Sequence, residues 1–255
     1  MTNQQRIDLI ERFIREHKYA DLQTLAAKFS GSLSTVRRAL DALESRGVVR
    51  RHHGGASLVE TDAVSQEYDF IARDQRHPEE KFAIASIVAA LVKPGMTVIL
   101  DGGSTTYAVA RLLAEKRLQI ITNSLPVASL FSDIGSAETI VTGGNIYSRL
   151  GVLVGPLCEQ SFDQTHADLA ILGGAGITES GIWNHNALIV AAQRKMIAAA
   201  ERTVFALDES KFGRKALSLT SPFDARFTIV TNTRPAPAVV RSIATSGATL
   251  TVAAK

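Results

Sequence analysis

Residues 101–106, Asp-Gly-Gly-Ser-Thr-Thr, follow a largely apolar stretch and join an acid, two glycines and three hydroxyls in one run. Glycines let a backbone approach an anion closely, and a helix that begins here adds the partial positive charge of its N-terminus. We expect this run to hold the phosphate of a small molecule, with Asp101 accepting hydrogen bonds from hydroxyl groups of the ligand. The phosphate contacts are assigned to Gly102, Gly103, Ser104, Thr105 and Thr106. The alternative for the run is a structural turn between a strand and a helix. The alternative for Asp101 is a helix N-cap, a role that it could serve at the same time.

Other apolar runs in the second half of the chain also end in polar or small residues. Thr122 and Asn123 offer further polar contacts, although a turn stabilised by their side chains explains them equally well. The ammonium of Lys211 would neutralise a phosphate or a carboxylate, and a solvated loop lysine is the alternative. The remaining candidates around the same ligand are Gly143, Gly144, Gly173, Gly174 and His185. For these glycines, tight turns at the rim of a pocket are favoured over direct contact.

A second set of polar and basic side chains lies near the N-terminus, and these residue types are suited to contacts with nucleic acid. The helical candidates are Ser34, Thr35, Arg37 and Arg38, and those in the segment that follows are Arg50, Arg51, His52 and His53. Hydroxyl groups bond phosphates or base edges, and arginines bind guanine or phosphate. A solvated helix face is the alternative for the arginines. Metal binding by the two histidines is disfavoured because adjacent side chains point in different directions and no third ligand is near in the sequence.

The elements that would position the N-terminal set follow from the spacing of apolar residues. Residues 4–17 show the periodicity of an amphipathic helix, and Asp21 can cap a second helix. Residues 30–32, Ser-Gly-Ser, predict a tight turn, after which a third helix runs from residue 33 to about residue 46. Gly47 ends it, and residues 48–56 read as a strand, a turn and a return strand. Three helices and a hairpin predict a winged helix-turn-helix.

The second half of the chain alternates strands and helices. A helix is expected from His77-Pro78 to about residue 92, since proline suits the first turn. The strands are expected at residues 97–100, 119–122, 138–142, 168–172, 202–207 and 227–230. This order predicts an α/β domain with a parallel sheet covered by helices on both faces. Such sheets bind ligands at the carboxyl ends of their strands, where the candidate residues lie.

Charge and composition support two domains with different partners. The net charge of +3 arises within residues 1–60, which hold ten Lys or Arg and seven Asp or Glu, as expected of a DNA-binding part. We expect a DNA-binding domain at residues 1–58, a linker at 59–76 and a ligand-sensing domain at 77–255. A single cysteine excludes an internal disulfide, and we expect a cytoplasmic protein without a signal peptide, membrane span, metal or cofactor.

Two strings in the first domain, Thr35-Val-Arg-Arg38 and Arg50-Arg-His-His-Gly-Gly-Ala56, resemble the DeoR/GlpR family of bacterial sugar-metabolism repressors. The matching strings of the second domain are Asp101-Gly-Gly-Ser-Thr-Thr106, Ile121-Thr-Asn-Ser124, Thr142-Gly-Gly144, residues 168–176 and Asp208-Glu-Ser-Lys-Phe-Gly213. The resemblance covers nearly the whole chain in order. It implies a sensor domain with the fold of ribose-5-phosphate isomerase and coenzyme A transferases, and it strengthens the assignment of Lys211.

The chain departs from the family pattern at two positions. Ala39 stands where the usual helix has Asp, so we expect a carboxylate to be missing next to the DNA surface. Ile189 stands near a position where family members commonly carry an acid. Isomerisation of a sugar phosphate needs a base that moves a proton between carbons, so the second departure disfavours an enzyme.

These observations favour a metabolite-responsive transcriptional regulator, most simply a repressor of a carbohydrate-utilisation operon. Its partners would be double-stranded operator DNA and a phosphorylated sugar or related effector. A single head offers few base contacts, so dimers or tetramers are expected. One alternative is an enzyme of the sugar-phosphate isomerase or acyl-CoA transferase type with an accessory DNA-binding head. Another is a constitutive DNA-binding protein whose second domain is vestigial.

Overall fold

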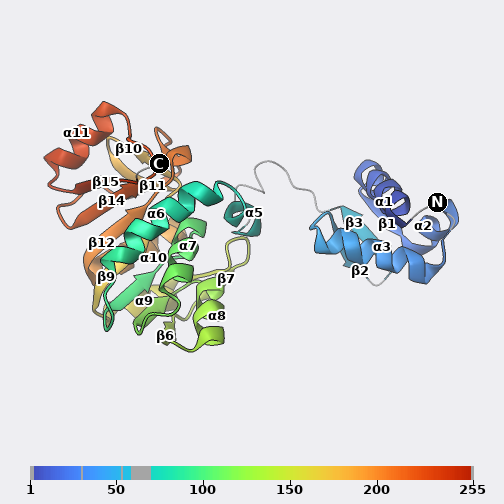
Figure 1. Cartoon of the computed structure of the whole chain (residues 1–255), viewed down its shortest axis with the longest axis horizontal. Coiled ribbons are helices and arrows are strands. Elements are labelled where there is room, and N and C mark those ends of the chain that lie inside the picture. The colour runs from blue at the N-terminus through green and yellow to red at the C-terminus, as the bar shows by residue number, and fades with distance from the viewer. Residues whose placement is uncertain (1–2, 30, 53, 59–69, 254–255) are drawn as a thin grey trace. The chain divides into compact units, whose positions relative to one another are not determined.

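The computed structural model describes residues 3–29, 31–52, 54–58 and 70–253, and the chain forms two compact units (Figure 1). The first unit is Met1–Gln66 and the second is Glu67–Lys255. Most of the expected linker, residues 59–69, lies outside the described residues. Within the rest of that range the structure adds a short helix, α5 (Phe70–Asp74), which belongs to the second unit.

In its described residues, the first unit has three helices and a three-stranded antiparallel sheet of order β1-β3-β2. Its elements are α1 (Asn3–His17), β1 (Tyr19–Asp21), α2 (Leu22–Lys28), α3 (Leu33–Ser45), β2 (Val49–His52) and β3 (Gly55–Leu58). The side chain of Asp21 accepts a hydrogen bond from the backbone N–H of Thr24, and Ser32 caps α3 in the same way through Thr35. These caps explain why the two helices begin where they do. The winged arrangement is confirmed, and β1 is an addition that the sequence did not indicate.

Ala39 corrects one expectation about the DNA surface. Its side chain is only 1% exposed and packs in the core of the first unit with Val36, Leu40 and Leu43, which are also buried residues of α3. Position 39 therefore faces the core and not solvent. An aspartate there would bury a charge, so the alanine tells us about packing and not about contacts with DNA.

The second unit is built on a seven-stranded sheet of order β15-β14-β12-β9-β4-β5-β6 in which all neighbours are parallel. Its strands are β4 (Thr97–Leu100), β5 (Gln119–Thr122), β6 (Glu138–Val141), β9 (Ala167–Leu172), β12 (Ala200–Ala206), β14 (Phe227–Thr231) and β15 (Thr249–Val252). The six expected strands are present, and β15 adds an edge strand. The predicted α/β class with a parallel sheet is confirmed.

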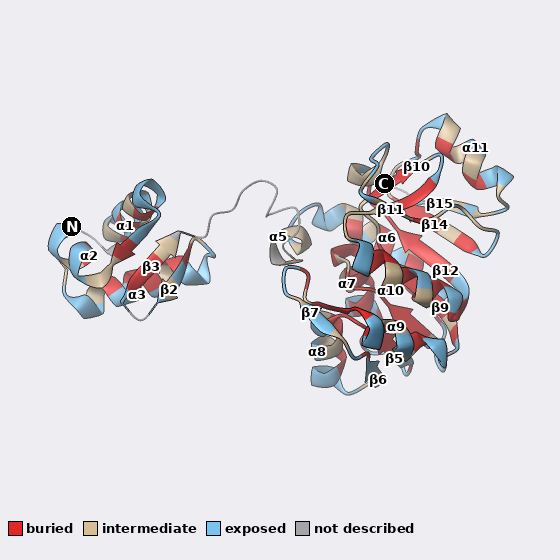
Figure 2. Cartoon of the chain, turned by 180° about the vertical axis from the view of Figure 1, so that it is seen from behind, coloured by how far each residue is buried: buried red, intermediate tan, exposed pale blue. Residues whose placement is uncertain are grey.

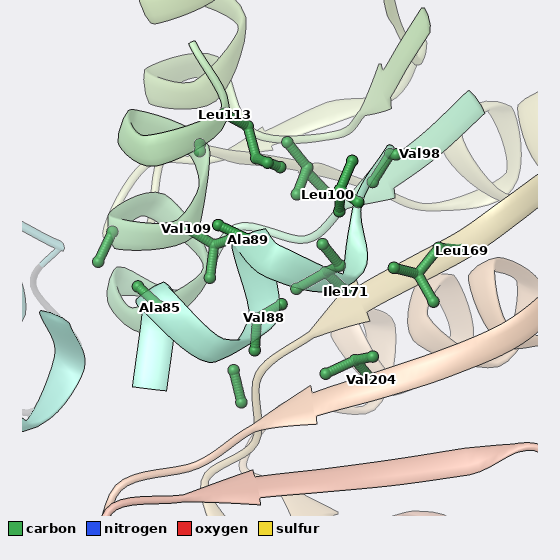
Figure 3. Packing of buried hydrophobic residues seen from close by; sticks show 14 of the residues in the cluster. Ala85, Val88, Ala89, Val98, Leu100, Val109, Leu113, Leu169, Ile171 and Val204 are labelled. Atoms are coloured by element: carbon green, nitrogen blue, oxygen red, sulfur yellow. The ribbon is translucent and has the colours of Figure 1, made fainter. Parts of the chain in front are cut away.

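Helices cover both faces of this sheet (Figure 2). One face packs against α6 (Pro78–Leu91), α7 (Ser104–Leu113) and α8 (Leu125–Ile134), and the other against α9 (Pro156–Asp163), α10 (Ala187–Ala198) and α11 (Pro237–Thr245). Alternate residues of β9 feed the two cores, because Leu169 and Ile171 join the first cluster while Ala170 and Leu172 join the second. Figure 3 shows the first cluster, in which Val88 and Val109 pack toward the strands. Burial on both faces holds the strand ends in place.

Several short elements beside the sheet were not predicted from the sequence. They are the hairpin β7 (Asn145–Tyr147) and β8 (Val152–Val154), the small sheet of β10 (Gly176–Thr178), β11 (Gly181–Asn184) and β13 (Ser218–Ser221), and the 3-10 turn η1 (Glu209–Lys211). Strands of three or four residues are too short to show a clear alternation of apolar and polar side chains. These elements matter because they carry residues of the pocket described next.

Candidate functional site

A cavity of about 200 Å³ opens at the carboxyl ends of β4 and β9 in the second unit. This is the edge where parallel sheets place their ligands. Its lining residues are Arg73, Asp101, Gly102, Gly103, Tyr147, Arg149, Leu150, Val152, Gly173, Gly174, Ala175, Asn184, His185, Asn186, Ile189 and Lys211. The space exceeds that of a single water many times over, so the cavity can hold a small metabolite.

Asp101 lies at the base of the cavity with only 5% of its surface exposed. One carboxylate oxygen accepts the N–H of Gly102 at 2.7 Å, and the other accepts the N–H of Gly173 at 3.3 Å and the amide of Gln193 at 2.7 Å. Burial raises the pKa of Asp101, and these three hydrogen bonds oppose that rise because they favour the carboxylate. Asp101 therefore joins the two glycine loops, a role that the sequence did not indicate.

Gln193 on α10 is a positioning residue that the sequence analysis missed. Its amide nitrogen bonds Asp101 and also the carbonyl of Gly173 at 3.1 Å. Its amide oxygen accepts hydrogen bonds from Asn184 at 3.3 Å and Thr220 at 3.2 Å. The side chain is only 1% exposed, and each of these partners lies on a different segment. The sequence gives one signal for such a role, because Gln193 is a polar residue that directly follows the apolar run 187–192 of the helix.

Three Lys or Arg side chains of the described residues line the cavity, and only Lys211 was expected. Lys211 stands 4.0 Å from the buried carboxylate of Asp208, while Arg73 comes from α5 and Arg149 from the connection between β7 and β8. Burial alone would raise the pKa of Asp208, but the Lys211 ammonium and the hydrogen bonds of Ser210 outweigh it and lower that pKa. Among the described lining residues Asp101 is the only acid, so this lining carries an excess of positive charge that suits an anionic ligand.

Another part of the cavity wall is apolar. Leu150, Val152 and Ile189 line it and pack together in one buried cluster, with Tyr147 against them. Ile189 is the position near which the family pattern has an acid, and here its side chain is 5% exposed. The cavity thus offers an aliphatic surface at this place and charged groups elsewhere.

The predicted hydroxyl residues lie beneath the cavity wall and not in it. Ser104, Thr105 and Thr106 are buried in the first turn of α7, and none of them is among the described residues that line the cavity. The hydroxyl of Thr106 has no hydrogen-bond partner among the described residues. Gly102 and Gly103, which precede them, do line it. The run 101–106 therefore meets the cavity through its first half.

Four further predicted residues hold the loops behind the cavity. Thr122 donates to the carbonyl of Leu100 at 2.6 Å and accepts the N–H of Ser124 at 3.0 Å, which corresponds to the turn alternative. Asn123 donates to the carbonyl of Leu153 in β8 at 2.9 Å. Gly143 and Gly144 lie beside β8 and α9, and a Cβ at Gly144 would fall 2.6 Å from the carbonyl oxygen of Val154. None of the four is among the described lining residues.

The remaining predicted pocket residues do line the cavity. They are Gly173, Gly174, His185 and Lys211. Gly102 shows why a glycine is needed there, because a Cβ would lie 2.0 Å from a methyl group of Val152. Close approach of the 101–103 loop to β8 closes the floor of the cavity.

The outer face of α3 presents the predicted DNA-binding residues of the first unit. Ser34, Arg37 and Arg38 are exposed, and Thr35 is half-buried with its hydroxyl 2.8 Å from that of Ser32. The opposite face of the helix is buried. The helix therefore presents its first two turns to solvent, as a recognition helix must.

The residues of β2 alternate between two environments. Arg51 is paired with Asp41 on α3, and its backbone N–H donates to the carboxylate of Glu44 at 2.8 Å. Arg50 and His52 are exposed, and His52 lies 2.8 Å from the hydroxyl of Ser57. His53 lies outside the described residues. The side chains of Arg50 and His52 are thus exposed to solvent, whereas Arg51 is engaged within the unit.

Both units match known protein families. Residues 6–62 match the model of the DeoR-like helix-turn-helix domain, and residues 76–233 match that of the DeoR C terminal sensor domain. The chain belongs to the DeoR family. The first match includes the exposed arginines of the first unit, and the second includes all the described lining residues of the cavity except Arg73.

Several DeoR-family relatives are similar over most of their length. The glycerol-3-phosphate regulon repressor of Escherichia coli K12 is 33% identical, over 85% of this chain and 86% of the relative. The transcriptional repressor AccR of Agrobacterium fabrum is also 33% identical, over 91% and 90%. The regulator UlaR of Shigella sonnei is 26% identical, over 98% and 99%. Among solved structures, ribose 5-phosphate isomerase A from Methanocaldococcus jannaschii aligns with 52% of this chain and 54% of that chain, at 20% identity and a TM-score of 0.38.

The described part of this DeoR-family chain carries neither a cluster of metal-ligating side chains nor a helix suited to a membrane. Its His, Cys, Asp and Glu side chains form no group of three or more that could hold a metal ion. No helix in the same part of the chain is both long and apolar enough to cross a membrane. Cys158 is a buried free thiol.

Proposed function

We propose that this DeoR-family protein is a transcriptional repressor of a carbohydrate-utilisation operon, and that a phosphorylated sugar or a related metabolite releases it from operator DNA. The observation that carries the proposal is the basic cavity in the sensor unit, with Arg73, Arg149 and Lys211 around an otherwise largely uncharged lining. A family relative is named for a glycerol-3-phosphate regulon, which is consistent with a phosphorylated ligand.

The DNA-binding role rests on the exposed residues of the first unit. Ser34, Arg37 and Arg38 on α3 would enter the major groove, and Arg50 and His52 would contact the phosphate backbone. Such a small unit reads few base pairs, so we propose that the protein acts as a dimer or tetramer on repeated half-sites in the cytoplasm. By linkage, an effector that releases DNA must bind the DNA-free arrangement more tightly, and DNA must weaken effector binding equally.

The test uses the purified full chain and the DNA upstream of its own gene. Binding measured by fluorescence anisotropy should be selective over scrambled DNA, and it should weaken steeply with added salt because counterions are released from the phosphates. Thermal unfolding with glycerol 3-phosphate, ribose 5-phosphate, glucose 6-phosphate and sugar acids should then identify compounds that raise the melting temperature. The stabilising compound should lower the affinity for the upstream DNA. Absence of selective DNA binding would contradict the proposed function as a transcriptional regulator. If none of the compounds raises the melting temperature, a constitutive DNA-binding protein would be favoured.

The alternative of an isomerase-type enzyme is testable with the same preparation. Proton transfer between carbons needs a base within hydrogen-bond reach of the substrate. Both oxygens of Asp101 already accept hydrogen bonds from Gly102, Gly173 and Gln193, which suits a structural acid. We therefore propose no catalytic role for it. Turnover of a pentose or hexose phosphate that is lost in Asp101→Ala, with the protein still folded, would reverse this ranking.

A further inference from the structure

The helix α5 makes part of the cavity wall and is also the first described element after residues 59–69. Those residues lead to it from the DNA-binding unit. Arg73, on the last turn of α5, lines the cavity. A helix of five residues has little stability of its own, because its nucleation cost is not recovered over so few hydrogen bonds. The position of α5 therefore depends on its contacts with the sensor unit.

The start of α5 is held by residues that belong to or adjoin the cavity. The N–H of Phe70 donates to the carbonyl of Arg149 at 3.0 Å, and Arg149 is itself a lining residue. The ring of Phe70 meets that of Tyr107 on α7 edge-on, with centroids 5.3 Å apart. Any group that restrains Arg149 would therefore also restrain the beginning of α5.

The end of α5 is held by a buried lysine. Lys81 on α6 is 5% exposed, and its ammonium donates to the carbonyls of Arg73 and Arg76 and, at 3.5 Å, to that of Asp74. These are carbonyls of the kind that a helix end leaves without partners, so the lysine serves as a cap. Arg111 on α7 adds an ion pair to the side chain of Asp74 at 3.2 Å.

We propose that Arg73 and Arg149 bind the anionic group of the effector together with Lys211, and that α5 thereby transmits effector binding to the connection with the DNA-binding unit. Arg73 belongs to α5, and the carbonyl of Arg149 accepts a hydrogen bond from its first residue, so an anion bound to both arginines adds a restraint to α5. This inference rests on the proposed function. In the competing arrangement Lys211 alone holds the anion and α5 is only a structural cover.

The first test measures anion binding with inorganic phosphate as the probe and the full chain as the protein. Wild type should gain thermal stability in phosphate, and amide hydrogen exchange in residues 70–76 should slow. Arg73→Gln keeps the length of a polar side chain but removes the charge, so we expect about tenfold weaker phosphate binding and loss of the slower exchange. Arg76→Gln is the matched control, because it removes an exposed arginine of the same segment that is not a lining residue.

The outcomes separate this inference from the function on which it rests. Phosphate binding by Arg73→Gln with wild-type affinity would overturn the role of Arg73. Protection of the 101–103 loop without protection of residues 70–76 would overturn the role of α5. If wild type itself does not bind phosphate, the anionic effector of the proposed function fails as well, and this is seen before any variant is compared.

The second test asks whether α5 transmits the effect to DNA. Lys81→Met removes the ammonium that caps α5 and leaves the three basic lining residues in place. We expect it still to bind phosphate through Arg149 and Lys211, at most severalfold more weakly because Arg73 is held less firmly. At saturating phosphate, the decrease in affinity for the upstream DNA should be smaller than in wild type. Arg111→Gln removes the ion pair to Asp74 and the cation–π contact with Tyr107. It should give a weaker effect in the same direction, and it serves if Lys81→Met does not fold. A full decrease in both variants would overturn transmission through α5.

Discussion

The two units of this protein both present basic residues to an anion, but they assemble them in different ways. The first unit places Arg37, Arg38 and Arg50 on its exposed surface within one short stretch of chain. The second unit brings Arg73, Arg149 and Lys211 together from three distant segments around a cavity. Exposed charges are screened by salt and suit a long polyanion, whereas charges around a cavity act on one enclosed group. The difference teaches that local sequence is enough for the first kind of site, while the second kind depends on topology.

The strongest test of this comparison is removal of the carboxylate beneath the cavity. Asp101→Ala leaves the N–H donors of Gly102, Gly173 and Gln193 without this acceptor. The free energy of unfolding of the sensor unit should therefore fall by about 4 kcal/mol, and its melting temperature by roughly 10 °C. Calorimetry of the full chain measures the loss. Asp133→Ala, at an exposed position of α8, is the control and should change little. Equal effects in both variants would show that Asp101 does not join the loops.

The second test removes charge from the exposed site alone. The double variant Arg37→Gln with Arg38→Gln should weaken binding to the upstream DNA by about 3 kcal/mol. The slope of log affinity against log salt concentration should correspond to about two fewer phosphate contacts. Its melting temperature and its phosphate binding should match those of wild type, because both side chains are exposed. Arg117→Gln, an exposed arginine of the second unit, should leave DNA binding unchanged. Loss of phosphate binding in the double variant would mean that the two sites are not separate.

The third test uses pH to probe the lysine that caps α5. Burial lowers the pKa of Lys81 to about 8 from 10.5, and the charges of Asp208 and Asp74 only partly oppose this. Between pH 8 and 10.5 the unfolded chain therefore binds more protons at this site than the folded chain, so the free energy of unfolding rises with pH across that window. Between pH 8 and pH 10.5, the free energy of unfolding of wild type should rise by about 2 kcal/mol more than that of Lys81→Met. Parallel pH profiles of the two proteins would contradict the lowered pKa.

The smallest expected effect distinguishes two neighbouring arginines of β2. Arg50→Gln should weaken DNA binding severalfold and leave stability unchanged, because its side chain is exposed. Arg51→Gln breaks the surface ion pair with Asp41, so it should lower stability by less than about 1 kcal/mol and affect DNA binding less than Arg50→Gln does. Anisotropy titrations and thermal melts of both variants provide the comparison. The reverse order in DNA affinity would place Arg51, and not Arg50, at the phosphate backbone.

Much of the fold was predictable because its signals are local. Asp21 caps α2 as expected, Ser32 of the predicted turn caps α3, and Gly47 ends α3 with a positive φ of 69°. The six predicted strands of the large sheet are present because each is a short apolar run followed by a polar loop. The sheet order and the strand β15 were not predictable, because pairing between strands depends on contacts far apart in the sequence.

The cavity was predictable only in part. Asp101, Gly102, Gly103, Gly173, Gly174, His185 and Lys211 line it as a set, and these residues follow strands or stand near them. Arg73 and Arg149 were missed because one was assigned to the linker and the other lies beside a three-residue strand. Ser104, Thr105 and Thr106 were expected to face the ligand, yet the first turn of α7 buries their side chains. A hydroxyl run shows which residue types are present, but not which side of the chain meets the cavity.

By itself, the sequence determined the elements, the class of each domain and the separation of a basic N-terminal part from a sensor. These follow from periodicity, caps and charge, which act over a few residues. Only the tertiary structure decided that Gln193 joins Asp101 to three other segments, that Lys81 caps α5 and that Arg73 reaches the cavity. The reason is physical: a buried polar side chain must find its partners wherever the packed chain places them, and that place is set by the parallel sheet as a whole.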